Sequence, residues 1–190
     1  MRICVDIDGI LADFVGEFLP HLNQKFGCDL TREDVICYSF AKVINVPSEQ
    51  VGNLITQLGN EGLYVRLQPV TGAVTAMRQL NKNHEVNLVT DRPIERHNDT
   101  VEWLNAHGIP HLQLYHCRND ERKAFMLSND IIIEDNLEYA LAVANKRQCT
   151  VILYDHPWNR DGQLPANVHR VTSWQQATEL IERLEVEYVF

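Results

Sequence analysis

The chain has 190 residues, a hydrophobic fraction of 45% and a formal net charge of −9 at pH 7. This length suits one domain, or one domain with an inserted subdomain, and it is enough to bury a core. The acidic balance argues against a nucleic-acid groove or an anionic membrane surface as the main partner, whereas a small anionic substrate stays open.

The cysteine pattern and the amino terminus indicate the compartment. The five cysteines are scattered, odd in number and without zinc-site spacing, so we expect reduced thiols. The amino terminus leads directly into a predicted strand rather than a signal peptide, and no apolar run approaches a membrane span. We therefore expect a cytoplasmic protein with no membrane partner.

The first predicted strand lies at the amino terminus and ends in two acids. Its apolar, β-branched run is typical of a strand buried on both faces of a parallel sheet. Asp6 and Asp8 are two residues apart, so their side chains would leave the same side of the strand, and Gly9 permits a sharp turn. Paired carboxylates repel unless a cation intervenes, and ligation by oxygen favours Mg²⁺. The alternative is a strand end with solvated acids.

A helix is predicted next, from Leu11 to Phe26, by its apolar spacing. Pro20 is expected to kink or end this helix, and Gly27 to stop it. Further helix starts are expected near Thr31 and Pro47, within a segment that shows no convincing strand.

We predict that residues 13–70 form a small helical cap, inserted after the first strand and closing over its carboxyl end. Residues 1–12 and 71–190 would then form the core domain. The alternative is that the helices of 13–70 are the first crossover of the sheet, with no lid function.

Beyond the predicted cap, strands and helices alternate, which is typical of βαβ units. We therefore predict an α/β fold with a Rossmann-like parallel sheet flanked by helices. The predicted strands span 85–90, 112–115, 130–136 and 149–154, with 168–171 as a short edge strand. The predicted helices span 69–80, 94–107 and 137–146, with a short one around Lys123 and one capped by Ser173.

Several polar groups fall near the carboxyl ends of these strands. Besides the first acid pair they are Thr90, Lys123, Glu134 and Asp135. A metal and a lysine would offset the charge of a phosphate, and a hydroxyl would donate to its oxygens. A carboxylate could attack phosphorus in line and form an aspartyl-phosphate. The set therefore favours phosphoryl transfer.

These motifs carry a resemblance to a known superfamily. Asp6-Ile7-Asp8-Gly9-Ile10-Leu11, Thr90, Lys123 and Glu134-Asp135, in this order, resemble the four motifs of the haloacid dehalogenase phosphohydrolases, which implies the HAD-type fold. Residues 6–14, 90–93, 103–104 and 108–110 are similar to the 5'(3')-deoxyribonucleotidase family and its bacterial relatives.

The resemblance implies a role for each motif residue. Asp6 would be the nucleophile and a metal ligand. Asp8 would act as general acid and then as general base, while its backbone carbonyl contacts the metal. Thr90 and Lys123 would hold the transferring phosphoryl group. Lys146 is the rival lysine, but it follows the last acid motif and so breaks the family order.

The resemblance also implies ligands for Mg²⁺ and for the substrate. Glu134 and Asp135 would complete the metal site, and the sequence leaves open which of them binds Mg²⁺ directly. Phe14 would contact the base of a deoxynucleoside monophosphate, or else pack within the cap. Arg92 would reach the phosphate, or else brace the turn.

Other interpretations stay open at this point. A receiver-type signalling domain also joins acids, a threonine and a lysine around Mg²⁺, and a binding-only version of the phosphatase fold is a weaker alternative. Among enzymes, the rival is a phosphatase for another small ester, such as a sugar or cofactor phosphate. Tyr38, Phe40 and Tyr64 could sandwich a base or form the cap core. The sequence leaves the oligomeric state open, a homodimer included.

Overall fold

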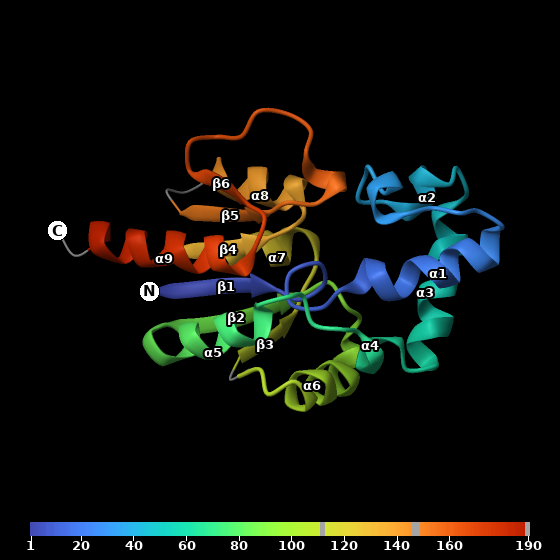
Figure 1. Cartoon of the computed structure of the whole chain (residues 1–190), viewed down its shortest axis with the longest axis horizontal. Helices are drawn as coiled ribbons and strands as arrows, with labels where there is room; N and C mark the ends of the chain where they lie inside the picture. Colours follow the sequence, from blue (N-terminus) through green and yellow to red (C-terminus); the bar gives the residue numbers. More distant parts are fainter. Residues whose placement is uncertain (111–112, 146–148, 189–190) are drawn as a thin grey trace.

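The computed structural model of the chain describes residues 1–110, 113–145 and 149–188. Within them, the centre is a six-stranded sheet in the order β3-β2-β1-β4-β5-β6, with all neighbours parallel (Figure 1). The strands are β1 (Arg2–Asp6), β2 (Glu85–Thr90), β3 (Gln113–His116), β4 (Ile131–Glu134), β5 (Thr150–Tyr154) and β6 (Val168–Val171). The predicted parallel sheet is confirmed, with residues 168–171 as its edge strand.

Helices cover both faces of the sheet, since successive strand residues point to opposite sides. In β1, Ile3 and Val5 join one apolar cluster, whereas Cys4 joins the other. The first cluster receives side chains from α5 (Ala73–Asn83), α6 (His97–Ala106) and α9 (Trp174–Tyr188). The second receives them from α7 (Asn119–Met126) and α8 (Leu137–Ala144). Because all the strands are parallel, their carboxyl ends lie at one edge of the sheet, which the helices on the two faces do not cover.

A second group of helices lies beyond the carboxyl end of β1 (Figure 1). It consists of α1 (Phe14–Phe26), η1 (Arg32–Asp34), α2 (Phe40–Val43), α3 (Ser48–Asn60) and α4 (Leu63–Arg66). The chain enters and leaves the group side by side, because the Asp13 amide donates to the Gln68 carbonyl and the Val70 amide to the Leu11 carbonyl, each at 2.8 Å. The group also packs against the core, because α4 contacts α6 and Trp103 Nε1 donates to the Leu67 carbonyl at 2.7 Å. We call this group of helices the cap.

The structure corrects one of the two expected effects of Pro20, namely that it ends the helix. This residue lies inside α1, which continues to Phe26 and ends at Gly27 in the left-handed conformation. Proline removes the bond to the carbonyl four residues earlier, here that of Gly16. Both Pro20 and Gly16 are exposed, so water can solvate that carbonyl while the buried side of the helix packs.

Other expected boundaries also shift. The first helix begins at Phe14 rather than Leu11, because Asp13 caps it by accepting the Gly16 amide at 3.0 Å. The helix expected over 94–107 begins as η2 (Ile94–Arg96) and continues as α6. The helix expected over 137–146 ends at Ala144. Residues 112 and 146 lie outside the described residues.

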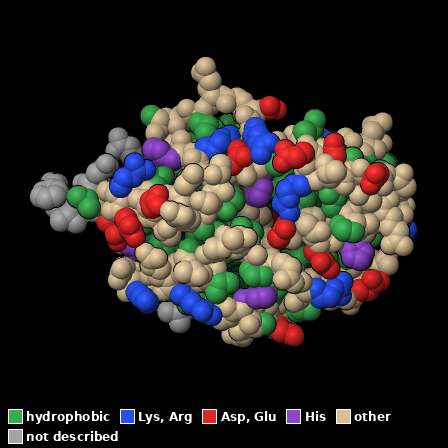
Figure 2. Space-filling model, viewed as in Figure 1, with side chains coloured by type: hydrophobic (Ala, Val, Ile, Leu, Met, Phe, Trp, Pro, Cys, Tyr) green, Lys and Arg blue, Asp and Glu red, His purple; other side chains and the backbone are tan. Residues whose placement is uncertain are grey.

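The surface of the described chain also bears on its partners. None of its helices combines the length and the apolar character that a membrane crossing requires. On the face drawn in Figure 2, acidic and basic side chains are interspersed. That face therefore lacks the basic stripe typical of nucleic-acid binding.

Candidate active site

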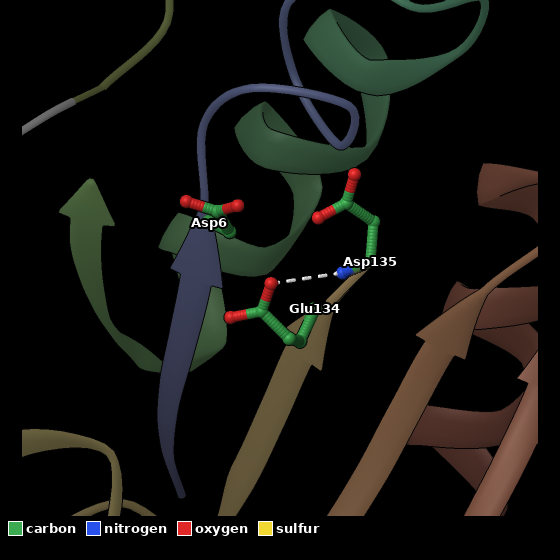
Figure 3. A group of neighbouring side chains, drawn as sticks. All are labelled: Asp6, Glu134 and Asp135. Atoms are coloured by element: carbon green, nitrogen blue, oxygen red, sulfur yellow. Dashed lines mark hydrogen bonds between the residues drawn. The ribbon is translucent and has the colours of Figure 1, made fainter. Parts of the chain in front are cut away.

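Three carboxylates from two neighbouring strands meet at the carboxyl edge of the sheet (Figure 3). Asp6 ends β1, Glu134 ends β4, and Asp135 follows Glu134. One oxygen from each lies within 4.8 Å of the others, and each residue is at most 3% exposed. β1 and β4 pair in parallel, so their ends arrive at the same place. We call these three residues the acid cluster.

Among the described residues, Arg122 of α7 is the cation inside this cluster. Its Nη2 lies 2.9 Å from Asp6 Oδ1 and 2.6 Å from Glu134 Oε2, and its Nη1 lies 3.2 Å from Asp91 Oδ1. Its guanidinium also lies 4.9 Å from the centre of the Tyr139 ring. Burial would lower the pKa of Arg122, but the three carboxylates raise it well above its usual range. Arg122 is therefore charged.

This single cation does not balance the acid cluster. Burial raises the pKa of Asp6 well above its usual range, and although Arg122 lowers it, Glu134 raises it further. Burial also raises the pKa of Asp135, and Asp6 and Glu134 add to that shift. A divalent cation among these oxygens would relieve the repulsion.

Two buried polar atoms of the site have no partner among the described residues: Asp135 Oδ1 and Arg122 Nε. One is an acceptor and the other is a donor, so a cation and an anion would satisfy them respectively. A donor set made of carboxylate oxygens suits Mg²⁺. The residues present therefore fit the expected metal.

The two acids after β4 differ in how their oxygens are used. Glu134 Oε1 accepts the amides of Asp135 and Asn136 at 3.0 Å each, and Oε2 accepts Arg122 Nη2. Both oxygens of Glu134 are thus engaged, whereas Oδ1 of Asp135 is not. Asp135 is therefore better placed than Glu134 for direct metal ligation.

Gly9 lets the turn after β1 approach Asp135. Its φ is +85°, and a Cβ atom there would collide with the carboxylate of Asp135. The carboxyl-terminal half of the chain braces this turn, because His156 Nε2 lies 2.8 Å from the Gly9 carbonyl and Trp174 Nε1 donates to the Ile10 carbonyl at 2.9 Å. These long-range contacts hold the turn against the acid cluster.

Asp8, on the same turn, is held by Arg92. Arg92 Nε donates to Asp8 Oδ2 at 2.8 Å, and Nη2 donates to Asp8 Oδ1 at 2.7 Å. The side chain of Arg92 is 1% exposed, whereas that of Asp8 is 27% exposed. Arg92, expected to reach a phosphate or brace the turn, thus engages the second acid of the first motif.

Thr90 ends β2, next to β1 in the sheet. It is buried, and its hydroxyl oxygen accepts the Arg92 amide at 3.2 Å, which leaves the hydroxyl proton to donate. Asp6 pairs with Val89 in the register of the two strands, so Thr90 lies beside the segment that follows Asp6. This is the placement expected from the order of the motifs.

No described contact brings Lys123 to the acid cluster. Its ammonium lies 3.7 Å from Glu138 and 3.9 Å from Asp120, two well-exposed carboxylates. Sequence reasoning missed the preceding residue, Arg122. A signal was present, since Arg122 and Met126 are four residues apart and so share a helix face. That face is the buried one.

Phe14, the expected base contact, lies in an aromatic cluster of the cap. It is half-buried, with its ring centre 5.2 Å from that of Phe18, 6.3 Å from Tyr64 and 6.4 Å from Phe40. The ring of Tyr64 also lies under the Arg92 guanidinium, 4.7 Å away. The cluster therefore reaches from the cap to the turn that carries Asp8.

Tyr38 lies in the cap, between η1 and α2, and the residue is 51% exposed. Burial of the hydroxyl nevertheless raises the pKa of Tyr38 well above its usual range, and the charges of Asp135 and Asp6 add to this. Its hydroxyl thus lies within electrostatic reach of the cluster.

Known proteins that resemble the chain are nucleotidases. The family model described as "5' nucleotidase, deoxy (Pyrimidine), cytosolic type C protein" matches residues 1–187. A protein of Halalkalibacterium halodurans is 30% identical over 184 residues, covering 95% of this chain and 92% of the relative. A 5'(3')-deoxyribonucleotidase of Bacillus subtilis is 25% identical over 180 residues, covering 92% and 94%.

Solved structures show the same fold. A HAD family hydrolase of Deinococcus radiodurans, with bound phosphate and sodium, superposes with a TM-score of 0.66 at 14% identity, covering 96% of this chain and 95% of that one. A haloacid dehalogenase-like protein of Streptococcus pneumoniae gives 0.67 at 11% identity, covering 95% and 97%. With the family match over nearly the whole chain, these findings favour an enzyme over a receiver-type domain. The chain belongs to the deoxy (pyrimidine) cytosolic type C family of 5' nucleotidases, so it is a phosphoric monoester hydrolase, and its fold is that of the haloacid dehalogenase-like hydrolases.

Proposed function

We propose that the chain is a Mg²⁺-dependent 5'(3')-deoxyribonucleotidase that acts through an aspartyl-phosphate on Asp6. The observation that carries this is the buried Asp6 carboxylate beside Arg122 and Asp135, with Asp8 on the turn directly after it. The names of the relatives support a nucleoside monophosphate as the substrate. The cytoplasmic location expected from the sequence belongs to this proposal as well.

The chemistry divides into two displacements. In the first, an oxygen of Asp6 bonds to phosphorus while the bond from phosphorus to the nucleoside oxygen breaks, and Asp8 gives that oxygen a proton. In the second, Asp8 takes a proton from a water that attacks the aspartyl-phosphate, which releases phosphate and restores Asp6.

Other side chains would hold the transferring group. Arg122, through its unpartnered Nε, and the hydroxyl of Thr90, which follows the register partner of Asp6, are donors beside Asp6. Such donors stabilise charge that develops in the transition state. A bound Mg²⁺, held by Asp6, Asp135 and the Asp8 carbonyl, would offset the charge of the phosphate.

The test is a panel of phosphate monoesters assayed with Mg²⁺ and with chelator. We expect deoxynucleoside 5'- and 3'-monophosphates to give the highest kcat/KM, and chelator to stop turnover. If sugar phosphates react faster than every deoxynucleotide offered, the nucleotidase proposal fails and a general small-molecule phosphatase takes its place.

The use of the two acids after β4 leads to a prediction on metal binding. Asp135→Asn removes an oxygen that is free for a metal, so we expect it to weaken Mg²⁺ binding by more than ~100-fold, beyond the ~10–100-fold typical of a residue that supports a ligand. Glu134→Gln should fall within that lower range, because Glu134 acts on Arg122 and on backbone amides. Isothermal titration with Mg²⁺ measures both.

The exposed acid Asp161 supplies the control, since Asp161→Asn changes the net charge equally and its side chain lies in an exposed loop, outside the acid cluster. It should leave Mg²⁺ affinity unchanged. Unaltered Mg²⁺ affinity in both Asp135→Asn and Glu134→Gln would contradict the assignment of these acids to the metal site. A larger loss for Glu134→Gln would make Glu134 the direct ligand and Asp135 the supporting residue.

The aromatic cluster leads to a prediction on substrate binding. Stacking of a base on an aromatic ring is worth ~1–3 kcal/mol, which corresponds to about a tenfold to hundredfold effect. We expect Phe14→Ala to raise KM for a deoxynucleotide by about that factor and to leave hydrolysis of p-nitrophenyl phosphate nearly unchanged, since that ester lacks a base.

Phe26→Ala is the matched control, because Phe26 is a half-buried phenylalanine at the other end of the same helix. It removes the same side-chain atoms from α1, at the end of the helix away from the proposed base site. Equal losses on both substrates in Phe14→Ala, as expected for Phe26→Ala, would mark Phe14 as a packing residue of the cap.

A further inference from the structure

Arg92 makes a planar, two-bond contact with Asp8. Its Nε and Nη2 each donate to a different Asp8 oxygen, at 2.8 and 2.7 Å. Such a fork fixes the plane of the carboxylate as well as its position. The Asp8 side chain is partly exposed to solvent, whereas that of Arg92 is buried. Arg92 thus holds Asp8 from the buried side of the pair.

The cap contacts the same guanidinium through Tyr64 of α4. The ring of this buried tyrosine lies 4.7 Å from Arg92 Cζ. A cation over an aromatic face is attracted by the ring, more strongly where both are desolvated. A change in the position of α4 would therefore change the surroundings of the group that holds Asp8.

A chain of hydrogen bonds makes a second connection. Arg92 Nη1 donates to the Thr100 hydroxyl at 3.1 Å, and that hydroxyl donates to the Arg96 carbonyl at 2.8 Å. Arg96 in turn donates to the Gly59 carbonyl and to Asn60 Oδ1, each at 2.8 Å, at the end of cap helix α3. Two sets of contacts, one through Tyr64 and one through Thr100 and Arg96, thus link the cap to Arg92.

We propose that Arg92 is a positioning residue that holds the Asp8 carboxylate in line for proton transfer and ties its placement to the cap. The inference rests on the proposed function, in which Asp8 exchanges a proton with the leaving group and with water. It assigns Arg92 to Asp8 rather than to the phosphate, because Asp8 and Thr100 occupy three of its donor groups.

The test compares two esters in Arg92→Lys, which keeps the charge but loses the fork. A deoxynucleotide releases a poor leaving group that needs a proton, whereas p-nitrophenyl phosphate releases nitrophenolate without one. We expect phosphoryl transfer from the deoxynucleotide to slow by about 100-fold, the cost of a misplaced catalytic group. Transfer from p-nitrophenyl phosphate should be nearly unchanged.

A burst of nitrophenol is the decisive signal. Hydrolysis of the aspartyl-phosphate still needs Asp8, so this second step should be slow in Arg92→Lys. The first turnover should therefore be faster than later ones and release one equivalent of nitrophenol per enzyme. Thr100→Val and Tyr64→Leu, which loosen the two links, should show the same burst with smaller rate losses. Ile55→Val, a conservative change in cap helix α3, should show no burst.

Equal loss on both esters without a burst in Arg92→Lys would overturn the inference, and a rise in KM for both would assign Arg92 to the phosphate. If circular dichroism shows that Arg92→Lys does not fold, the burst of nitrophenol is measured in Thr100→Val instead, and its presence or absence decides. If the unmodified protein hydrolyses no phosphate ester, the proposed function fails instead, and that result is recorded before any variant is compared.

Discussion

Asp6→Asn is expected to abolish phosphatase activity while the fold survives. Removing the nucleophile of an enzyme with a covalent intermediate lowers kcat by about 10⁶-fold, which takes turnover below detection. The fold should survive because Asn keeps the shape of Asp6 and can accept the hydrogen bond of Arg122. Steady-state turnover of a deoxynucleotide with Mg²⁺, together with circular dichroism, measures both effects.

Thermal stability makes the same variant more informative. Burial and Glu134 raise the pKa of Asp6, so its charge is unfavourable in the metal-free protein. Without Mg²⁺, the Tm of Asp6→Asn should equal or exceed that of the unmodified protein, since each kcal/mol regained is worth about 2–4 °C at this chain length. Added Mg²⁺ should raise the Tm of the unmodified protein more than that of the variant.

The exposed-acid variant Asp161→Asn is again the control and should keep full activity. Turnover retained by Asp6→Asn would remove Asp6 as the nucleophile. Phosphate found on Asp8 by peptide mass analysis would instead reverse the roles of the two acids. A Tm well below that of the unmodified protein would show that Asp6 is required for the fold, and the loss of activity would then carry no assignment.

The sheet and the acid cluster could be predicted because both follow from short-range patterns. Ile131-Ile132-Ile133 and Thr150 to Tyr154 are apolar runs long enough for strands and buried throughout. The carboxyl ends of parallel strands share one edge, so the acids that follow two such runs had to meet there. Spacing along the chain was sufficient to bring Asp6 and Asp135 together.

The cap was harder to predict because packing overrides its local signals. Each of the helices α2 and α4 has four residues, too few to show an apolar period, and they form where Tyr64 and Ala41 are buried against their neighbours. Pro20 shows that packing can also overcome a local signal that breaks a helix. The residue favours a helix end, but α1 continues past it because the opposite side of the helix is buried.

The partners of the site residues could not be predicted, because they lie far apart in sequence. Arg92 is 84 residues from Asp8, and His156 is 147 residues from Gly9. Nothing in the spacing of a single chain indicates which arginine or histidine will meet a given turn. The sequence could name the motifs but not the side chains that hold them.

Arg122→Met should be much more damaging than Lys123→Met, although the two residues are adjacent. Arg122 touches Asp6, Glu134 and Asp91, and it is the donor that faces the proposed phosphoryl site. Loss of one such donor typically lowers kcat by ~10²–10³-fold. Arg122→Met also leaves buried carboxylates without their cation, which costs about 3–5 kcal/mol of stability. All measurements on this variant therefore include Mg²⁺, which offsets part of that charge.

Lys123→Met is the matched comparison, since it removes the same charge from the same helix. The recorded ion pairs of Lys123 are with exposed carboxylates, which contribute only ~0–1 kcal/mol, so both kcat and Tm should change little. Arg122→Lys separates catalysis from folding, because it keeps a cation in the cluster while losing the geometry of the guanidinium. If Lys123→Met loses activity by ~10²-fold or more and Arg122→Lys does not, Lys123 holds the phosphoryl group, as the order of the motifs first indicated.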